Sequence, residues 1–171
     1  LAIDAGIDFE SPEPDLGSEI ASLLENKAFS RKDIFEYYAN RVIYQYQRIH
    51  AVKSTEECWR YIRGYLDDFA RASGWPEQEL EKFEKEIIQS LNVLDEDFYA
   101  ESVDPILRPG ILQTKTNEVA HASNVFRDRY IFERIAEGLK KYNSVFVVYG
   151  AAHAVQQEPA FRALFENNLA Q

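Results

Sequence analysis

The segment Asn143-Ser-Val-Phe-Val-Val-Tyr-Gly-Ala-Ala-His153 decides the fold expected for this chain. Its central part, Val145 to Tyr149, is an unbroken run of β-branched and aromatic residues, which is typical of a strand buried on both faces of a parallel sheet. Gly150 ends the run, and His153 follows three residues later. Because open α/β sheets bind ligands at the carboxyl ends of their strands, the sequence predicts a functional imidazole here. The alternative is that His153 only bonds a nearby carbonyl group.

A second short strand is predicted at residues 7–10. It is ended by the hexapeptide Glu10-Ser-Pro-Glu-Pro-Asp15. This hexapeptide contains two prolines and three acids and cannot continue a strand or a helix. Glu10 and Glu13 are therefore also expected at a strand end. Each is either a functional carboxylate or part of a solvated acidic turn.

The bulk composition fits one globular domain. The chain has 171 residues, of which 46% are hydrophobic and 28% charged. A formal net charge of −10 argues against nucleic acid or an anionic membrane as the main partner. No apolar run approaches the roughly 18 residues that a membrane span needs. The single cysteine, Cys58, allows no internal disulfide and favours a reducing compartment, so a cytoplasmic location is expected.

Most of the remaining sequence predicts helices. Their expected ranges are 17–27, 30–50, a helix that begins at Ser54, 76–91, 116–141 and 159–168. Residues 30–91 are interpreted as a helical insertion or cap. The tyrosines of the 30–50 helix, Tyr38 among them, either line a pocket or belong to the core with their hydroxyl groups at its rim.

The two predicted strands are too few to make a sheet. Val145 to Tyr149 is apolar at every position, so both of its edges need neighbours. The chain also lacks methionine and begins with residues typical of a helix end. Residues 1–171 are therefore expected to form a single domain that is the C-terminal portion of a larger α/β domain. The expected partner is an N-terminal segment of the same gene product or a partner subunit that completes the sheet.

The segment from Asn124 to Phe165 resembles the later half of the TraB/GumN/Tiki superfamily, which includes the ChaN and erythromycin-esterase relatives. The resemblance rests on the order of its features: Arg127-Asp128 on a helix, an apolar strand, the Gly-x-x-His motif of Gly150 to His153, and a terminal helix. Two departures are plain. Many relatives have a glycine shortly after the motif histidine, where this chain continues Ala154-Val-Gln-Gln157, and the first motif of the family's earlier half is absent.

The resemblance implies an α/β fold of the Tiki/TraB type, with a partial parallel sheet and many helices. It also implies a peptidase- or esterase-like hydrolase that activates water near His153 and acts on a small-molecule or peptide substrate. The implied catalytic residues are His153, Glu10, Glu13, Arg127 and Asp128, and the implied substrate-binding residues are Gly150, Tyr149 and Tyr38.

The implied roles follow from the chemistry of these side chains. His153 serves as a general base or a metal ligand, and Glu10 is a carboxylate that either orients it or shares a metal with it. Arg127 holds a substrate anion or an oxyanion, and Asp128 fixes Arg127; the alternative for this pair is a surface salt bridge of little weight. A divalent metal is an option, but His153 is the only candidate ligand, and zinc sites use three or four protein ligands.

The rival hypothesis is a catalytically inactive binding or regulatory module of the same fold. The acidic surface and the missing first motif favour it. Its partner surface is expected on the helical insertion, near Tyr37, Tyr44 and Trp59.

Overall fold

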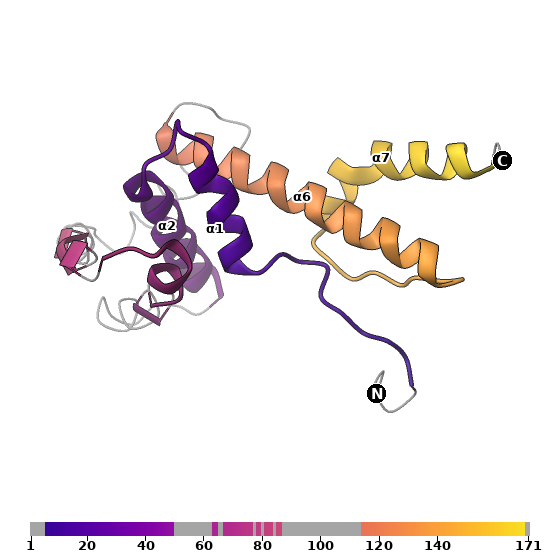
Figure 1. Ribbon diagram of the computed structural model, residues 1–171, viewed down its shortest axis with the longest axis horizontal. Helices are drawn as coiled ribbons and strands as arrows, with labels where there is room; N and C mark the ends of the chain where they lie inside the picture. The colour runs from indigo at the N-terminus through magenta and orange to yellow at the C-terminus, as the bar shows by residue number, and fades with distance from the viewer. Residues whose placement is uncertain are drawn as a thin grey trace. The chain divides into compact units, whose positions relative to one another are not determined.

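The computed structural model describes residues 6–49, 63–64, 67–76, 78–79, 81–83, 85–86 and 114–169. Its labelled helices are α1 (Leu16–Glu25), α2 (Arg31–Ile49), α6 (Lys115–Lys141) and α7 (Ala151–Leu169) (Figure 1). The chain divides into two compact units. We call Leu1–Pro14 with Val125–Gln171 the terminal unit, and Asp15–Asn124 the central unit. The boundary falls within α6, and the predicted insertion at residues 30–91 lies in the central unit.

The predicted α/β fold with a parallel sheet is wrong, because the described residues are mostly helical and include no strand. Residues 7–10 and 144–149 are extended, but they do not form backbone ladders with described residues. A strand is defined by hydrogen bonds to a neighbouring strand, so an extended run without such a neighbour stays an isolated segment. Among the described helices, none has both the length and the apolar character that crossing a bilayer requires.

Capping side chains set where the helices begin. Asp15 caps α1, because its carboxylate accepts a 2.9 Å hydrogen bond from the backbone N–H of Ser18. A hydrogen bond from the Ser18 hydroxyl, followed by this backbone bond, lowers the pKa of Asp15. Ser30 and Asp33 form the capping box of α2, in which each side chain accepts a bond from the other's backbone N–H. The predicted starts of these helices are therefore confirmed closely.

An aromatic cluster fills the core of the central unit. Phe35 of α2 is fully buried, and its ring centroid lies 5.5 Å from that of Phe69, 5.3 Å from that of Trp75 and 5.9 Å from that of Phe83. The first two pairs are edge-to-face, the arrangement that aromatic quadrupoles favour. Val119 and Ala120 of α6 belong to the same cluster. Apolar burial of this kind is the main source of the unit's stability.

A buried polar network joins three helices of the central unit. The Ser123 hydroxyl donates a 2.5 Å hydrogen bond to the carboxylate of Glu19 on α1. Because that bond uses the only proton on Ser123 Oγ, the Tyr37 hydroxyl donates its 3.1 Å bond to Ser123. Burial, followed by the charge of Glu19, raises the pKa of Tyr38 above its ordinary range. Arg41 approaches the same carboxylate at 3.8 Å.

This arrangement bears on two predictions from the sequence. Tyr38 is fully buried in the core of the central unit, as the core interpretation of the tyrosines expects, but its hydroxyl oxygen is buried as well and does not lie at the rim. Tyr37 is only 4% exposed, so it is not part of an open partner surface. The side chains of Tyr44 and Trp59 lie outside the described residues.

Besides its N-terminal segment, the terminal unit contains the C-terminal part of α6, the extended residues 142–150 and α7. Val145, Val147 and Tyr149 are partly buried, whereas Phe146 and Val148 are 92% and 78% exposed. The prediction that both faces of this run are buried is therefore wrong, and only alternate side chains turn inward. The Phe132 ring of α6 and the Phe161 ring of α7 join the two helices, with centroids 5.0 Å apart.

The start of the last helix also differs from its prediction at Pro159, because α7 begins at Ala151 and contains Pro159 in its interior. A proline within a helix cannot donate a hydrogen bond to the carbonyl four residues earlier. Proline often marks the first turn of a helix, which is why the start was predicted at Pro159. In α7, two helical turns already precede this proline. As a result, the motif histidine lies on a helix instead of in a loop.

Replacing Phe35 by alanine should lower the free energy of unfolding of the central unit by about 3–5 kcal/mol, because it removes a ring that contacts three others. Denaturant unfolding followed by tryptophan fluorescence measures this, since Trp75 lies in the cluster. Phe146→Ala is the matched control: its ring is 92% exposed, so a change within about 0.5 kcal/mol is expected. Equal effects of the two variants would contradict this account of the core.

Candidate functional site

The backbone at Gly150 places His153 in the first turn of α7. The Gly150 carbonyl accepts hydrogen bonds from the backbone N–H groups of His153, at 3.0 Å, and Ala154, at 3.4 Å. These bonds close the first helical turn. The Gly-x-x-His motif therefore forms a helix start, with the glycine at its cap and the histidine three residues inside.

Asp128 of α6 holds the imidazole of His153. The distance between His153 Nδ1 and Asp128 Oδ1 is 2.6 Å, and the two side chains are only 14% and 17% exposed. A carboxylate only accepts hydrogen bonds, so Nδ1 carries the proton of this bond. In the neutral ring, Nε2 then presents a lone pair, and no described residue forms a hydrogen bond with it. The pair therefore has the arrangement of an oriented general base.

Gln157 is a third member of the site and was not predicted from the sequence. It lies one helical turn after His153, and its Nε2 donates a 3.0 Å hydrogen bond to the same Asp128 Oδ1. The residue is only 3% exposed. The spacing of four between His153 and Gln157 would have placed them on one helix face, but the predicted helix began only at Pro159.

Tyr149 and Gly150 also lie beside His153. The centroids of the Tyr149 and His153 rings are 6.2 Å apart. Burial and then the negative charge of Asp128 raise the pKa of the Tyr149 phenol. A β-carbon added at Gly150 would lie 3.7 Å from His153 Cδ2, which is an ordinary contact distance. Both predicted substrate-binding residues of the motif thus adjoin the imidazole, whereas Tyr38 belongs to the central unit.

Residues 6–14, which we call the acidic strap, are tied to α6 by three of their acids. Arg127 donates from Nε and Nη2 to one oxygen of Glu13, at 3.1 Å and 2.8 Å. Arg134 donates to Glu10 at 2.8 Å. Lys141 Nζ lies 3.8 Å from the carboxylate of Asp8, which also accepts a hydrogen bond from the Tyr142 hydroxyl.

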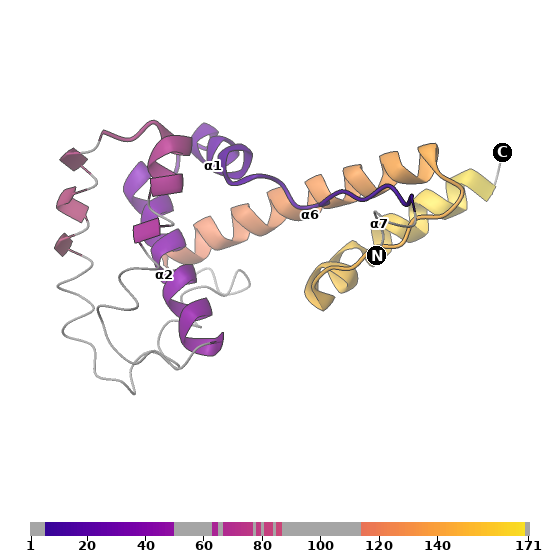
Figure 2. The same ribbon diagram turned by 90° about the horizontal axis from the view of Figure 1, so that it is seen from below.

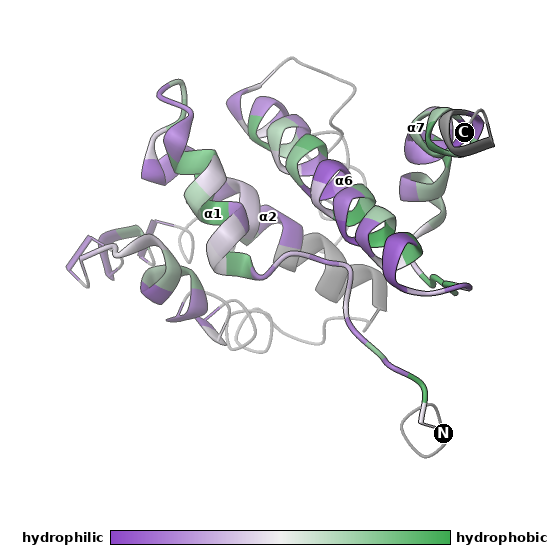
Figure 3. Cartoon of the chain, turned by 45° about the vertical axis from the view of Figure 1, so that its right-hand side comes forward, coloured by the Kyte–Doolittle hydropathy of each residue, from purple (hydrophilic) through white to green (hydrophobic). Residues whose placement is uncertain are grey.

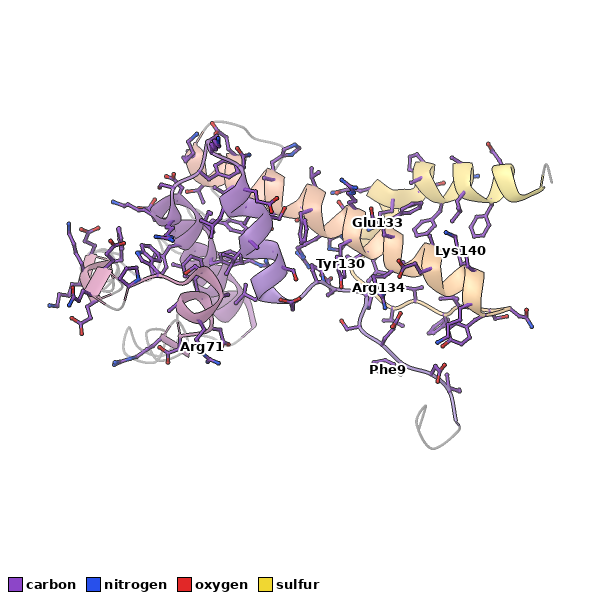
Figure 4. All side chains as sticks on the ribbon, in the orientation of Figure 1. Phe9, Arg71, Tyr130, Glu133, Arg134 and Lys140 are labelled. Atoms are coloured by element: carbon purple, nitrogen blue, oxygen red, sulfur yellow. The ribbon has the colours of Figure 1, made fainter. Side chains whose placement is uncertain are left out.

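The three basic residues of α6 that meet the strap, Arg127, Arg134 and Lys141, are spaced by seven along the helix. This is close to two full turns, so they share one face. Figure 2 shows the acidic strap alongside the C-terminal part of α6, and Figure 4 shows Arg134 on the side of α6 where the strap runs. Hydrophobic and hydrophilic residues alternate over residues 7–10 of the strap (Figure 3), and the strap's acids are the ones that bind α6. Glu10 raises the pKa of the Arg134 guanidinium.

The implied catalytic residues therefore all lie in the terminal unit, but they form two sets of partners. Asp128 bonds His153, whereas the resemblance implied that Asp128 fixes Arg127. Arg127 bonds Glu13 instead. The side chains of Glu10 and Glu13 bond arginines of α6, whereas the imidazole of His153 contacts Asp128 and Tyr149.

The donor set for a metal is small. Within the described part of the chain, no three His, Cys, Asp or Glu side chains gather closely enough to hold an ion. Among the described residues, Asp128 is the one potential metal ligand that bonds His153. Its carboxylate also accepts a hydrogen bond from Gln157. Zinc sites use three or four protein ligands, so these two residues do not make up such a set, and we assign no chemical step to a metal.

No family model matches this chain, and no curated protein or solved structure shows significant similarity to it. The resemblance to the TraB/GumN/Tiki superfamily therefore stays a prediction that rests on the residues quoted for it. The geometry around His153 must carry any functional argument by itself.

Removing the Arg134 side chain should free the acidic strap for cleavage after Glu10 by a glutamate-specific protease. An exposed ion pair contributes little to stability, so Arg134→Gln should speed this cleavage only about 2- to 5-fold. Mass spectrometry of limited digests measures the rate. Cleavage after Glu13 is not informative, because Pro14 follows it.

Arg129→Gln is the matched control for this experiment. Arg129 is 79% exposed and pairs with Glu133 on the same helix, so its loss should leave the strap as it was. High salt should accelerate cleavage of the unmodified protein, because it screens the pairs. A strap that is cut equally fast in all three proteins, with or without salt, would show that these pairs do not hold it.

Proposed function

We propose that the terminal unit is hydrolytic, with His153 as the general base that activates water. The observation that carries this proposal is the 2.6 Å hydrogen bond between His153 Nδ1 and Asp128 Oδ1 in a largely buried setting. It leaves Nε2 as the acceptor of the ring. The proposed bond to be cleaved is an ester or amide in a small-molecule or peptide substrate.

In the proposed reaction, Nε2 of His153 takes a proton from a water molecule as the water oxygen attacks the carbonyl carbon. Asp128 holds the ring in the required tautomer and stabilises the imidazolium that forms. The imidazolium then returns the proton to the leaving oxygen or nitrogen as the bond to it breaks. Each step needs Nε2 to be free of protein hydrogen bonds, which agrees with the contacts of the described residues.

The position of His153 within α7 also suits this chemistry. The first backbone N–H groups of a helix have no acceptor within it, and the helix dipole makes this end positive. Those groups belong to Ala151 and Ala152 here, because Gly150 caps the helix. A tetrahedral intermediate formed beside His153 carries a negative oxygen, which such donors stabilise.

Arg127 is proposed to anchor an anionic group of the substrate. Its guanidinium already holds the Glu13 carboxylate with two N–H donors, so it binds carboxylates in its present position. A substrate carboxylate would have to displace Glu13. Binding through Arg127 is therefore expected to compete with the acidic strap.

Loss of the imidazole should lower hydrolysis strongly. We expect His153→Ala and Asp128→Asn each to reduce kcat/KM by about 10²-fold or more, the usual scale for an oriented general base. The assay is a panel of p-nitrophenyl esters, lactones and fluorogenic peptides. His121→Ala is the control, because His121 is exposed on α6 and belongs to the central unit. Hydrolysis by His153→Ala at the rate of the unmodified protein would contradict the proposal.

A second proposal concerns binding, and the exposed apolar side chains of the terminal unit favour it. Ile7 and Phe9 are 60% and 79% exposed, and Phe146 and Val148 are 92% and 78% exposed. The backbone groups of residues 144–149 form no backbone hydrogen bond with a described residue. We propose that an extended segment of a partner subunit, or of another part of the same gene product, pairs with this backbone and covers these side chains.

Hydrogen exchange of the protein isolated in its native state tests this second proposal. The amides of residues 144–149 should exchange at least about 10²-fold more slowly than in a free peptide, because pairing protects backbone N–H groups. Phe146→Asp with Val148→Asp should remove the protection. Val155→Asp, on an exposed position of α7, should not. Exchange at the free-peptide rate in the unmodified protein would rule out a bound segment.

A further inference from the structure

Gln157 is buried in a way that packing alone does not explain. The residue is 3% exposed, its Nε2 donates a 3.0 Å hydrogen bond to Asp128 Oδ1, and its Oε1 is buried without a hydrogen-bond partner among the described residues. The orientation of the amide follows from chemistry, because the reverse orientation would set two acceptor oxygens against each other. A buried carbonyl oxygen without a partner is energetically unfavourable.

A methionine or leucine would fill the same space without this cost. What the amide adds is its N–H donor, and that donor points at the oxygen that holds His153. Asp128 Oδ1 accepts from His153 and from Gln157, which lie one turn apart on α7. A carboxylate held by one hydrogen bond can rotate about its terminal torsion, whereas two donors on one oxygen restrict that rotation.

We propose that Gln157 is the positioning residue of the histidine–aspartate pair. It locks the Asp128 carboxylate so that Oδ1 always receives the Nδ1 proton of His153, which keeps Nε2 as the free acceptor. Without this lock, Asp128 turns away part of the time and the imidazole samples the tautomer with its proton on Nε2. That tautomer cannot accept a proton from water. The expected effect of Gln157 on catalysis rests on the proposed general-base function of His153. The expected effect on the tautomer does not, because the tautomer is a property of the resting protein.

The test is the ¹⁵N spectrum of the histidine rings near pH 8.5, where an ordinary imidazole is neutral. The chemical shifts of the two nitrogens report which one carries the proton, and His153→Ala assigns the signals of His153. In the unmodified protein, the form protonated at Nδ1 should dominate. Gln157→Met should raise the share of the form protonated at Nε2 at least threefold. It should also lower kcat about 10-fold with little change in KM.

Gln156→Met is the matched control, because Gln156 is the exposed neighbour on the same helix. It should leave both the tautomer and kcat unchanged. A residue that only supports packing would alter the melting temperature without moving the tautomer. An unchanged tautomer in folded Gln157→Met therefore overturns the inference.

A measurement on the unmodified protein covers the case in which Gln157→Met does not fold. The side-chain amide protons of Gln157 should exchange with solvent much more slowly than those of Gln156, because only the former are buried and hydrogen-bonded. Equal exchange rates overturn the inference. The two proposals also fail separately. A tautomer that shifts in a protein without hydrolytic activity supports the positioning role and refutes the hydrolase. If hydrolysis depends on His153 but the tautomer does not change in Gln157→Met, the hydrolase proposal is supported and the positioning role is refuted.

Discussion

The negative charge of Asp128 is the constraint on which the arrangement of the terminal unit's site depends. A carboxylate that is only 17% exposed must replace lost water with donors, and here one oxygen receives the Nδ1 proton of His153 and the amide of Gln157. Both donors come from the first turns of α7. The start of that helix at Gly150 is therefore what brings them to α6, and a later start would leave the carboxylate without them. Burial and, after it, the charge of Asp128 raise the pKa of the adjacent Tyr149 phenol.

A second group of charges acts along the same helix without sharing partners with the first. The acidic strap supplies Glu13, Glu10 and Asp8, and α6 meets them with Arg127, Arg134 and Lys141. Neighbouring residues of a helix point about 100° apart, so Arg127 and Asp128 face different surroundings although they are adjacent. One bonds the strap and the other bonds α7. In a chain with a formal charge of −10, the pairs also neutralise acids that would otherwise repel one another.

The extended residues 144–149 have the composition of a buried strand, but no described residues pair with their backbone and only one of their two faces is covered. Alternate side chains turn toward the helices, as the partial burial of Val145 and Val147 shows, and the others are open to solvent. Val145 reaches α6 near Gly138, where an added β-carbon would lie 3.5 Å from the valine. Helices thus cover one side of the segment. Its backbone edge and its outer side chains are the features that favour a bound partner segment.

The sequence by itself determined the starts of α1 and α2, the extent of α6 and the site candidates. Ser30 with Asp33 predicts the start of α2 through bonds that span three residues, and the periodic apolar positions predict α6 almost to its ends. Their positions at predicted strand ends selected His153, Glu10 and Glu13, and the resemblance added Arg127 and Asp128. All five lie in the terminal unit. Only the tertiary structure decided which of them are partners, since Arg127 and Glu13 are 114 positions apart in sequence. It also decided that the apolar run is not a strand of a sheet, and that Gln157 joins the site. The physical reason is distance along the chain: a helix satisfies its backbone within a few residues, whereas a strand or an ion pair needs a partner that local sequence does not specify.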